Sequence, residues 1–190
     1  ILKAAGCPVA APSANRSGHV SPTTAAHVLA DLDGRIDAVV DGGPTEVGVE
    51  STIVACLDGS PVLLRPGGVP REAIEAVIGQ PLASAGGEAT IAPGMLASHY
   101  APQAGIRLDA TRVEPGEALL AFGPNPPPGA VAMLNLSPSG DLAEAAANLF
   151  GQLRVLDASG AARIAVMPIP AEGLGEAIRD RLARAAAPRG

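Results

Sequence analysis

Short apolar runs and helical spacings of hydrophobic residues follow one another through residues 1–79, which predicts a mixed α/β arrangement. Gly6 is the expected stop of a first helix, and Asp58-Gly59-Ser60 is the expected turn of a hairpin. The apolar runs predict strands at 7–11, 36–40, 51–57 and 61–64. The helical patterns cover 1–5, 22–31 and 70–78.

The pattern continues in the second half, where apolar strands alternate with amphipathic or Ala-rich helices. Such an alternation favours a small parallel α/β layer. The dinucleotide-binding pattern Gly-x-Gly-x-x-Gly is missing from it, so no nucleotide is assigned to this half. The expected strands are 118–122, 130–136 and 164–167, and the expected helices are 142–156 and 173–186.

A change of composition separates the two halves. Residues 80–92 are mostly Gly, Ala, Ser and Pro, which is typical of a linker. The ordered motifs Pro93-Gly94-Met95 and His99-Tyr100-Ala101-Pro102 follow it. We therefore expect a first domain at 1–79, a linker or lid at 80–104, and an accessory α/β domain at 105–190.

Composition sets the class of protein. The 190 residues are 47% hydrophobic, which is enough for real cores, but only 2% aromatic. The net charge is −6 and neither half is basic, so the sequence predicts no strong nucleic-acid footprint. No apolar run approaches the ~20 residues of a membrane span, and no membrane partner is expected.

The two cysteines, Cys7 and Cys56, lie far apart in apolar runs and are expected to be small buried hydrophobic residues. They form neither a metal-binding spacing nor a disulfide framework, which suits the reducing cytoplasm. Asp41 precedes two glycines and is interpreted as a turn former rather than a metal ligand. A Ser/His/Asp hydrolase is not favoured, because the Gly-x-Ser-x-Gly elbow is absent.

Candidate chemistry begins where the run 7–11 ends in Pro12-Ser13-Ala14-Asn15-Arg16-Ser17-Gly18. Backbone N–H groups in such a loop can approach phosphate oxygens, and Ser13 and Asn15 add a hydroxyl and an amide. A helix is then expected with Ser21 as its N-cap and Thr23 in its first turn, so more free N–H groups face the same place. An ordinary turn and helix start would use the same residue types.

Four motifs resemble those of a known family in their sequence, order and spacing: PSANRSGHVSPTTA, DGGPTEVGVESTIV, LLRPGGVPREAI and PGMLASHYAPQA. Together they resemble the threonylcarbamoyl-AMP synthases, the two-domain YrdC-type enzymes of tRNA modification, from about Gly6 to Leu182. The resemblance implies the C-terminal part of a YrdC-like twisted mixed sheet with helices, followed by a Rossmann-like accessory domain. The chain opens at Ile1 without an initiator Met, so we expect an N-terminally truncated member that is inactive alone.

The resemblance implies a reaction that condenses L-threonine, bicarbonate and ATP, with Mg²⁺, into threonylcarbamoyl-AMP and pyrophosphate. The product would pass to the tRNA threonylcarbamoyl transferase machinery in the cytoplasm. Such an enzyme mainly positions reactants and stabilises charge on phosphates, so no nucleophile is required, and no tightly bound, protein-ligated metal is expected. Two alternatives stay open: a YrdC-like carbamoyl transferase on another acceptor, and a non-catalytic module that binds RNA or protein.

Matched position by position, the resemblance implies an ATP site, to which Arg65 brings a bidentate fork suited to phosphate. Hydroxyls in strands also arise from β-propensity, and an Arg at a strand end also forms surface ion pairs. Tyr100, the only Tyr, is expected outside both cores, in a lid over the site; packing between domains is its alternative. The implied ATP contacts are Ser13, Asn15, Thr23, Arg65 and Tyr100, and the implied threonine contact is Ser51.

Overall fold

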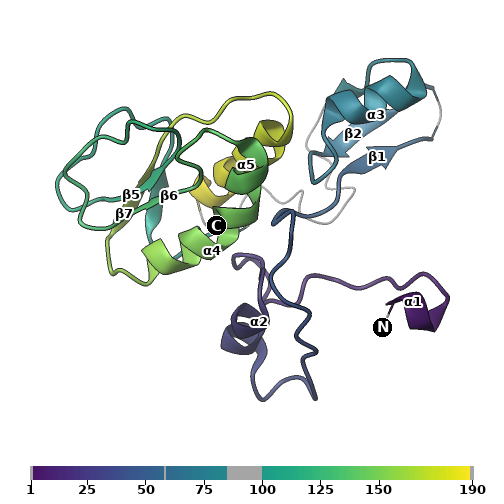
Figure 1. Cartoon of the computed structure of the whole chain (residues 1–190), viewed down its shortest axis with the longest axis horizontal. Helices are drawn as coiled ribbons and strands as arrows, with labels where there is room; N and C mark the ends of the chain where they lie inside the picture. Colours follow the sequence, from purple (N-terminus) through teal and green to yellow (C-terminus); the bar gives the residue numbers. More distant parts are fainter. Residues whose placement is uncertain (1, 58, 85–99, 189–190) are drawn as a thin grey trace.

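The structure is a computed structural model that describes residues 2–57, 59–84 and 100–188. The first region holds a small mixed sheet in which β1 pairs with β2 antiparallel (Figure 1). Its third strand, β3, pairs with β2 in parallel. Its elements in chain order are α1 (Leu2–Ala5), α2 (Ala25–Leu32), β1 (Ile53–Ala55), β2 (Val62–Arg65), α3 (Arg71–Ile78) and β3 (Ala83–Ser84).

The second region is a four-stranded parallel sheet in the order β4-β7-β5-β6. Helices α4 and α5 pack on each other and against this sheet. All four residues of the central strand β5 are buried, as expected for a parallel sheet enclosed on both faces. The elements are β4 (Gly105–Arg107), β5 (Ala118–Ala121), β6 (Met133–Asn135), α4 (Leu142–Asp157), β7 (Arg163–Val166) and α5 (Leu174–Ala186).

The α/β class and the parallel second layer are thus confirmed, and the structure adds the short strand β4, which was not predicted. The strands expected at 7–11 and 36–40 are absent, and these segments are largely exposed, with Val9 at 60% and Val40 at 72%. A strand needs a neighbour for its backbone groups, and the described part of the chain pairs none with either segment. The prediction that Cys7 and Cys56 are buried is also wrong, because both are exposed.

Two local expectations change as well. Helix α2 begins three residues later than predicted, with Thr24 as its N-cap, whose side chain accepts a hydrogen bond from the His27 N–H. The predicted cap, Ser21, instead donates its hydroxyl hydrogen bond to Glu50. Strand β3 falls within the segment that composition marked as linker, and the Ala83 N–H donates to the Pro61 carbonyl.

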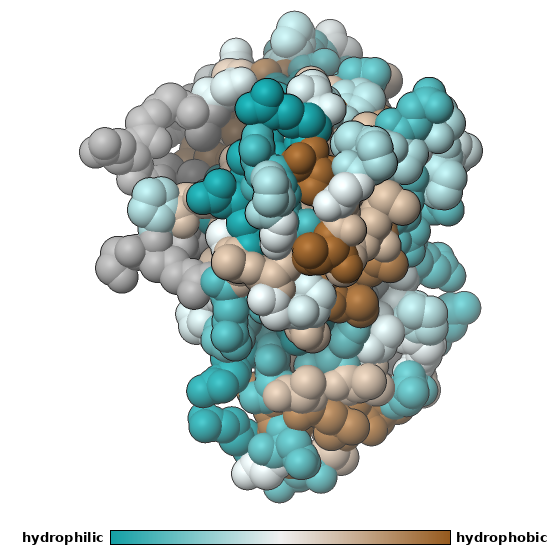
Figure 2. All heavy atoms as spheres, turned by 90° about the vertical axis from the view of Figure 1, so that its left-hand side faces the viewer, coloured by the Kyte–Doolittle hydropathy of each residue, from teal (hydrophilic) through white to brown (hydrophobic). Residues whose placement is uncertain are grey.

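The two regions share a hydrophobic core. Val20 and Tyr100 are buried in the same cluster as the inner faces of α4 and α5, and Val49 packs against it. Viewed from the side of the second region, the surface shows small hydrophobic patches surrounded by hydrophilic residues (Figure 2). No helix within the described residues has both the length and the apolar character needed to cross a bilayer.

Candidate functional site

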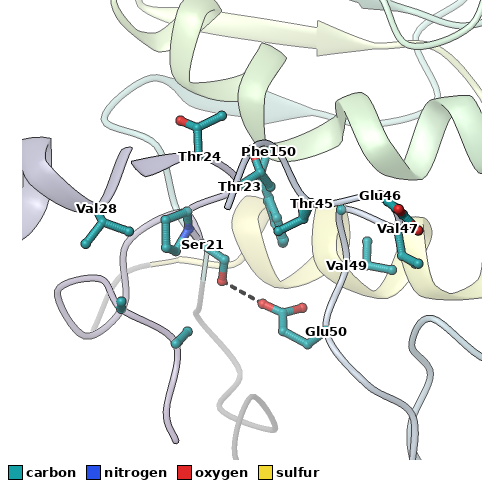
Figure 3. A pocket seen from close by; sticks show the side chains of 15 residues that line it. Ser21, Thr23, Thr24, Val28, Thr45, Glu46, Val47, Val49, Glu50 and Phe150 are labelled. Carbon is teal, nitrogen blue, oxygen red and sulfur yellow. Dashed lines mark hydrogen bonds between the residues drawn. The ribbon is translucent and has the colours of Figure 1, made fainter. Parts of the chain in front are cut away.

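An open cleft of about 690 Å³ lies where the first region meets helix α4 (Figure 3). One wall is the loop at Ser13 and Ala14 with the entrance to α2, the other is the segment 43–50, and Phe150 of α4 reaches between them. Gly48 lets the segment approach α4 closely. A Cβ at this position would lie 2.2 Å from the Ala146 carbonyl oxygen, and its φ is +75°.

Glu50 is one of the two carboxylates that line this cleft, the other being Glu46. The Ser21 hydroxyl donates to Oε1 at 2.6 Å, as Figure 3 shows, and Arg181 Nε donates to Oε2 at 2.8 Å. Burial acts to raise the pKa of Glu50, but the charge and hydrogen bond of Arg181, together with the bond from Ser21, hold this pKa below its ordinary 4.5. Glu50 is therefore ionised and fixed at both carboxylate oxygens.

The second region supplies Arg181, a residue of α5 with no exposed surface. Its Nη1 donates to Asp180 Oδ2 at 2.5 Å, and its guanidinium carbon lies 5.3 Å from the centre of the Tyr100 ring. The same ring stacks on Phe150 with centroids 5.4 Å apart. An ion pair and a cation–π contact therefore join α5 to two segments that precede it in the chain.

Arg65, at the end of β2, lies in the same neighbourhood and is 6% exposed. Its Nη2 donates to the Ser51 carbonyl at 2.7 Å. Burial first, and then the charge of Arg181, lower the pKa of Arg65. The glycine after Pro66 makes this approach possible, because a Cβ on Gly67 would lie 2.4 Å from the carbonyl oxygen of Glu50.

The predicted ATP residues of the first loop lie at or beside the cleft. Ser13 is exposed and lines it. Thr23 is buried in its wall, with its Oγ1 3.3 Å from Nδ1 of His27. Asn15 closes its own loop, since its Nδ2 donates to the Arg16 and His19 carbonyls, each at 3.1 Å.

Ser51 and Tyr100 differ from the simple expectation. The Ser51 side chain is exposed and does not line the cleft, although its carbonyl holds Arg65. The prediction that Tyr100 lies outside both cores is wrong: it is 1% exposed within the core that the two regions share. An aromatic ring that is buried against Phe150 and beside a guanidinium gains more there than in an exposed linker.

Sequence reasoning missed the two charged residues that connect the site, Glu50 and Arg181. Glu50 directly precedes Ser51 in the second motif, which was the available signal. Arg181 lies in the closing segment of the matched sequence and carries no motif of its own. Within the described residues, no three His, Cys, Asp or Glu side chains gather as a metal site.

Comparison with known proteins places these features in a family. A family model described as "Threonylcarbamoyl-AMP synthase, C-terminal domain" matches residues 69–187, and one described as "Telomere recombination" matches residues 1–67. The chain belongs to the threonylcarbamoyl-AMP synthase family. The resemblance seen in the four motifs is thereby confirmed.

Similar proteins of this family come from bacteria and archaea. The threonylcarbamoyl-AMP synthase of Bacillus subtilis is 54% identical over 57% of this chain and 32% of its own length. That of Pyrococcus abyssi is 38% identical over 94% of this chain and 57% of its own length. The chain therefore spans about half the length, or less, of these synthases.

The fold agrees with solved structures. The crystal structure of P. abyssi Sua5 complexed with L-threonine matches 97% of this chain and 59% of its own, with a TM-score of 0.84 and 34% identity. A variant of the same protein matches with a TM-score of 0.81 and 32% identity, over 97% of this chain and 58% of its own.

Proposed function

We propose that this chain carries part of the active site of an L-threonylcarbamoyladenylate synthase, which condenses L-threonine, bicarbonate and ATP into threonylcarbamoyl-AMP and pyrophosphate. The observation that carries the proposal is the match of nearly the whole chain to a family structure that holds L-threonine. The clustering of Ser51, Arg65 and Tyr100 around the Glu50–Arg181 pair supports it.

In this proposal the chain positions reactants instead of forming a covalent intermediate. Ser13, Asn15 and Thr23 hold ATP at the loop before α2, and Arg65 and Tyr100 are the further ATP contacts. Ser51 contacts threonine at the entrance of β1. Fixed donors of this kind stabilise the charge that develops when the carbamate attacks the α-phosphate and pyrophosphate leaves.

We propose that Mg²⁺ binds together with ATP. It would neutralise charge on the phosphates, and waters and phosphate oxygens are its customary ligands beside one or two carboxylates. The product is a mixed anhydride, and we propose that the tRNA threonylcarbamoyl transferase machinery of the cytoplasm consumes it.

The test is the replacement Arg65→Lys in the full coding sequence that contains this chain. Lys keeps the charge but loses the planar fork, so we expect pyrophosphate release from threonine, bicarbonate and ATP to fall roughly tenfold or more, because one charge-assisted hydrogen bond is lost. Arg112→Lys is the matched control, since that side chain is 81% exposed and pairs only locally with Glu114 in its salt bridge.

The measurement is pyrophosphate release per folded molecule, with threonine omitted as a blank. If Arg65→Lys and Arg112→Lys retain equal activity, Arg65 is not part of the ATP site. A wild-type protein that releases no pyrophosphate in a threonine-dependent manner would overturn the proposed function itself.

A further inference from the structure

Arg181 is an unusual residue for an accessory domain, because a charged side chain on α5 has no exposed surface. Removing a guanidinium from water is costly unless its donors are paired. Here Nε binds Glu50 of the first region and Nη1 binds Asp180 of the same helix. A buried ion pair adds little net stability compared with apolar packing, so stability alone is a weak reason for this arrangement.

The contacts of Arg181 lead to the residues of the proposed site. Glu50 is joined by one peptide bond to Ser51, whose carbonyl oxygen accepts the hydrogen bond of Arg65. The Tyr100 ring lies under the same guanidinium. One side chain of the second region thus touches the segments that would carry threonine and ATP contacts.

We propose that Arg181 is a positioning residue of the synthase reaction, supplied by the second region, which fixes the Glu50-Ser51 segment and the Tyr100 ring for substrate binding. This inference rests on the proposed function. It makes the second region a structural part of the substrate site, because its α5 sets the geometry of residues that belong to the first.

The chemistry requires Arg at this position. A planar guanidinium can bind Glu50 and Asp180 through different nitrogens while one face lies on the Tyr100 ring. A Lys ammonium is a compact point charge and cannot span both carboxylates in one plane. Arg181→Lys therefore preserves the charge and removes the alignment.

The experiment compares Arg181→Lys with Arg184→Lys, a matched control one turn further along α5 that pairs with Asp180. Both variants are made in the full coding sequence that contains this chain. The fluorescence and near-ultraviolet circular dichroism of the Tyr100 ring are isolated as the difference between each protein and the same protein with Tyr100→Phe. We expect Arg181→Lys to change both signals, and to raise the KM for threonine and for ATP roughly tenfold with a smaller change in kcat. Arg184→Lys should leave KM and both signals unchanged.

Glu50→Gln is the second variant, because it removes the partner charge while leaving the guanidinium in place. It should raise KM in the same direction as Arg181→Lys. Equal KM, kcat and tyrosine signals for wild type and both variants, measured per folded molecule, would overturn the positioning role. If the wild-type enzyme makes no product, the proposed function fails, and the tyrosine signals of the variants alone then decide whether Arg181 positions Tyr100.

Discussion

At the scale of single residues, Tyr100 has the packing role that the sequence offered as the alternative to a lid. Its ring stacks on Phe150 and makes a cation–π contact with Arg181, and burial raises the pKa of its hydroxyl, against the opposing charge of Arg181. Its backbone has a φ of +60°, in the left-handed region that bulky residues seldom adopt. Such a conformation is kept only where the surroundings over-determine it, as the two ring contacts do here.

We therefore expect Tyr100→Ala to lower the free energy of unfolding by about 3–5 kcal/mol, the usual cost of removing a buried aromatic ring. Tyr100→Phe keeps the ring stack and should cost about 1 kcal/mol, so it is the better variant for testing an ATP contact. Urea unfolding followed by far-ultraviolet circular dichroism measures both. If Tyr100→Ala leaves the unfolding free energy unchanged, the packing role is wrong and the prediction of an exposed lid stands.

The sequence alone could not show which residues far apart in the chain pair with each other. Ser13 and Thr23 were found because they stand in a recognisable loop and helix entrance, and both line the cleft. Glu50 and Arg181 are separated by 131 positions, and only the docking of the two regions joins them. Neither carries a local signal for the other.

At the scale of elements, strands β5, β6 and β7 of the second region were predicted from continuous apolar runs, such as Ala118–Ala121, which are typical of buried parallel strands, whereas the three-residue strand β4 was not. In the first region the same signal at 7–11 and 36–40 predicted strands that the structure lacks. An apolar run records what a segment is able to bury, whereas a strand also requires a neighbour for its backbone groups. Local composition cannot report that neighbour.

The contact between the segment 46–50 and helix α4 gives an element-scale prediction. Gly48→Ala places a Cβ 2.2 Å from the Ala146 carbonyl oxygen, so the segment must withdraw from α4. Gly43→Ala is the matched control, because Gly43 also has a positive φ, +87°, but a Cβ there meets none of the described atoms within 4 Å.

Both variants should lose about 1–2 kcal/mol of unfolding free energy to the left-handed backbone. Gly48→Ala should lose about 1–3 kcal/mol more from the forced displacement. Urea unfolding of the two variants side by side measures the difference. Equal losses would mean that the segment does not dock on α4 in solution.

At the scale of the whole molecule, three ion pairs between described residues join the two regions, in addition to shared apolar burial. The pair Arg71–Glu176 links α3 to α5 at 2.6 Å through a bidentate contact. Arg71 therefore also helps to hold the two regions together. The three pairs are Glu50–Arg181, Arg71–Glu176 and Asp31–Arg154. Acid should therefore weaken the attachment of one region to the other.

The pKa of Glu50 determines how the stability of this attachment changes with pH. Its pKa in the folded protein is below the ordinary 4.5, so its ionised form is stabilised by folding. The contribution is complete above pH 4.5 and is lost as the pH falls through the lower folded value. Glu50→Gln has no such titration, so the unfolding free energy of wild type should exceed that of the variant at pH 7, by an amount that shrinks as the pH falls below 4.5.

Urea unfolding at a series of pH values from 7 to 3 measures this difference, and subtraction removes the carboxylates that the two proteins share. Glu46→Gln serves as the control, because Glu46 is an exposed glutamate on the same segment. Its difference from wild type should stay near zero throughout. If the difference between wild type and Glu50→Gln is the same at pH 3 as at pH 7, then Glu50 does not hold the two regions together through its charge, and the ion pair with Arg181 contributes nothing to their docking.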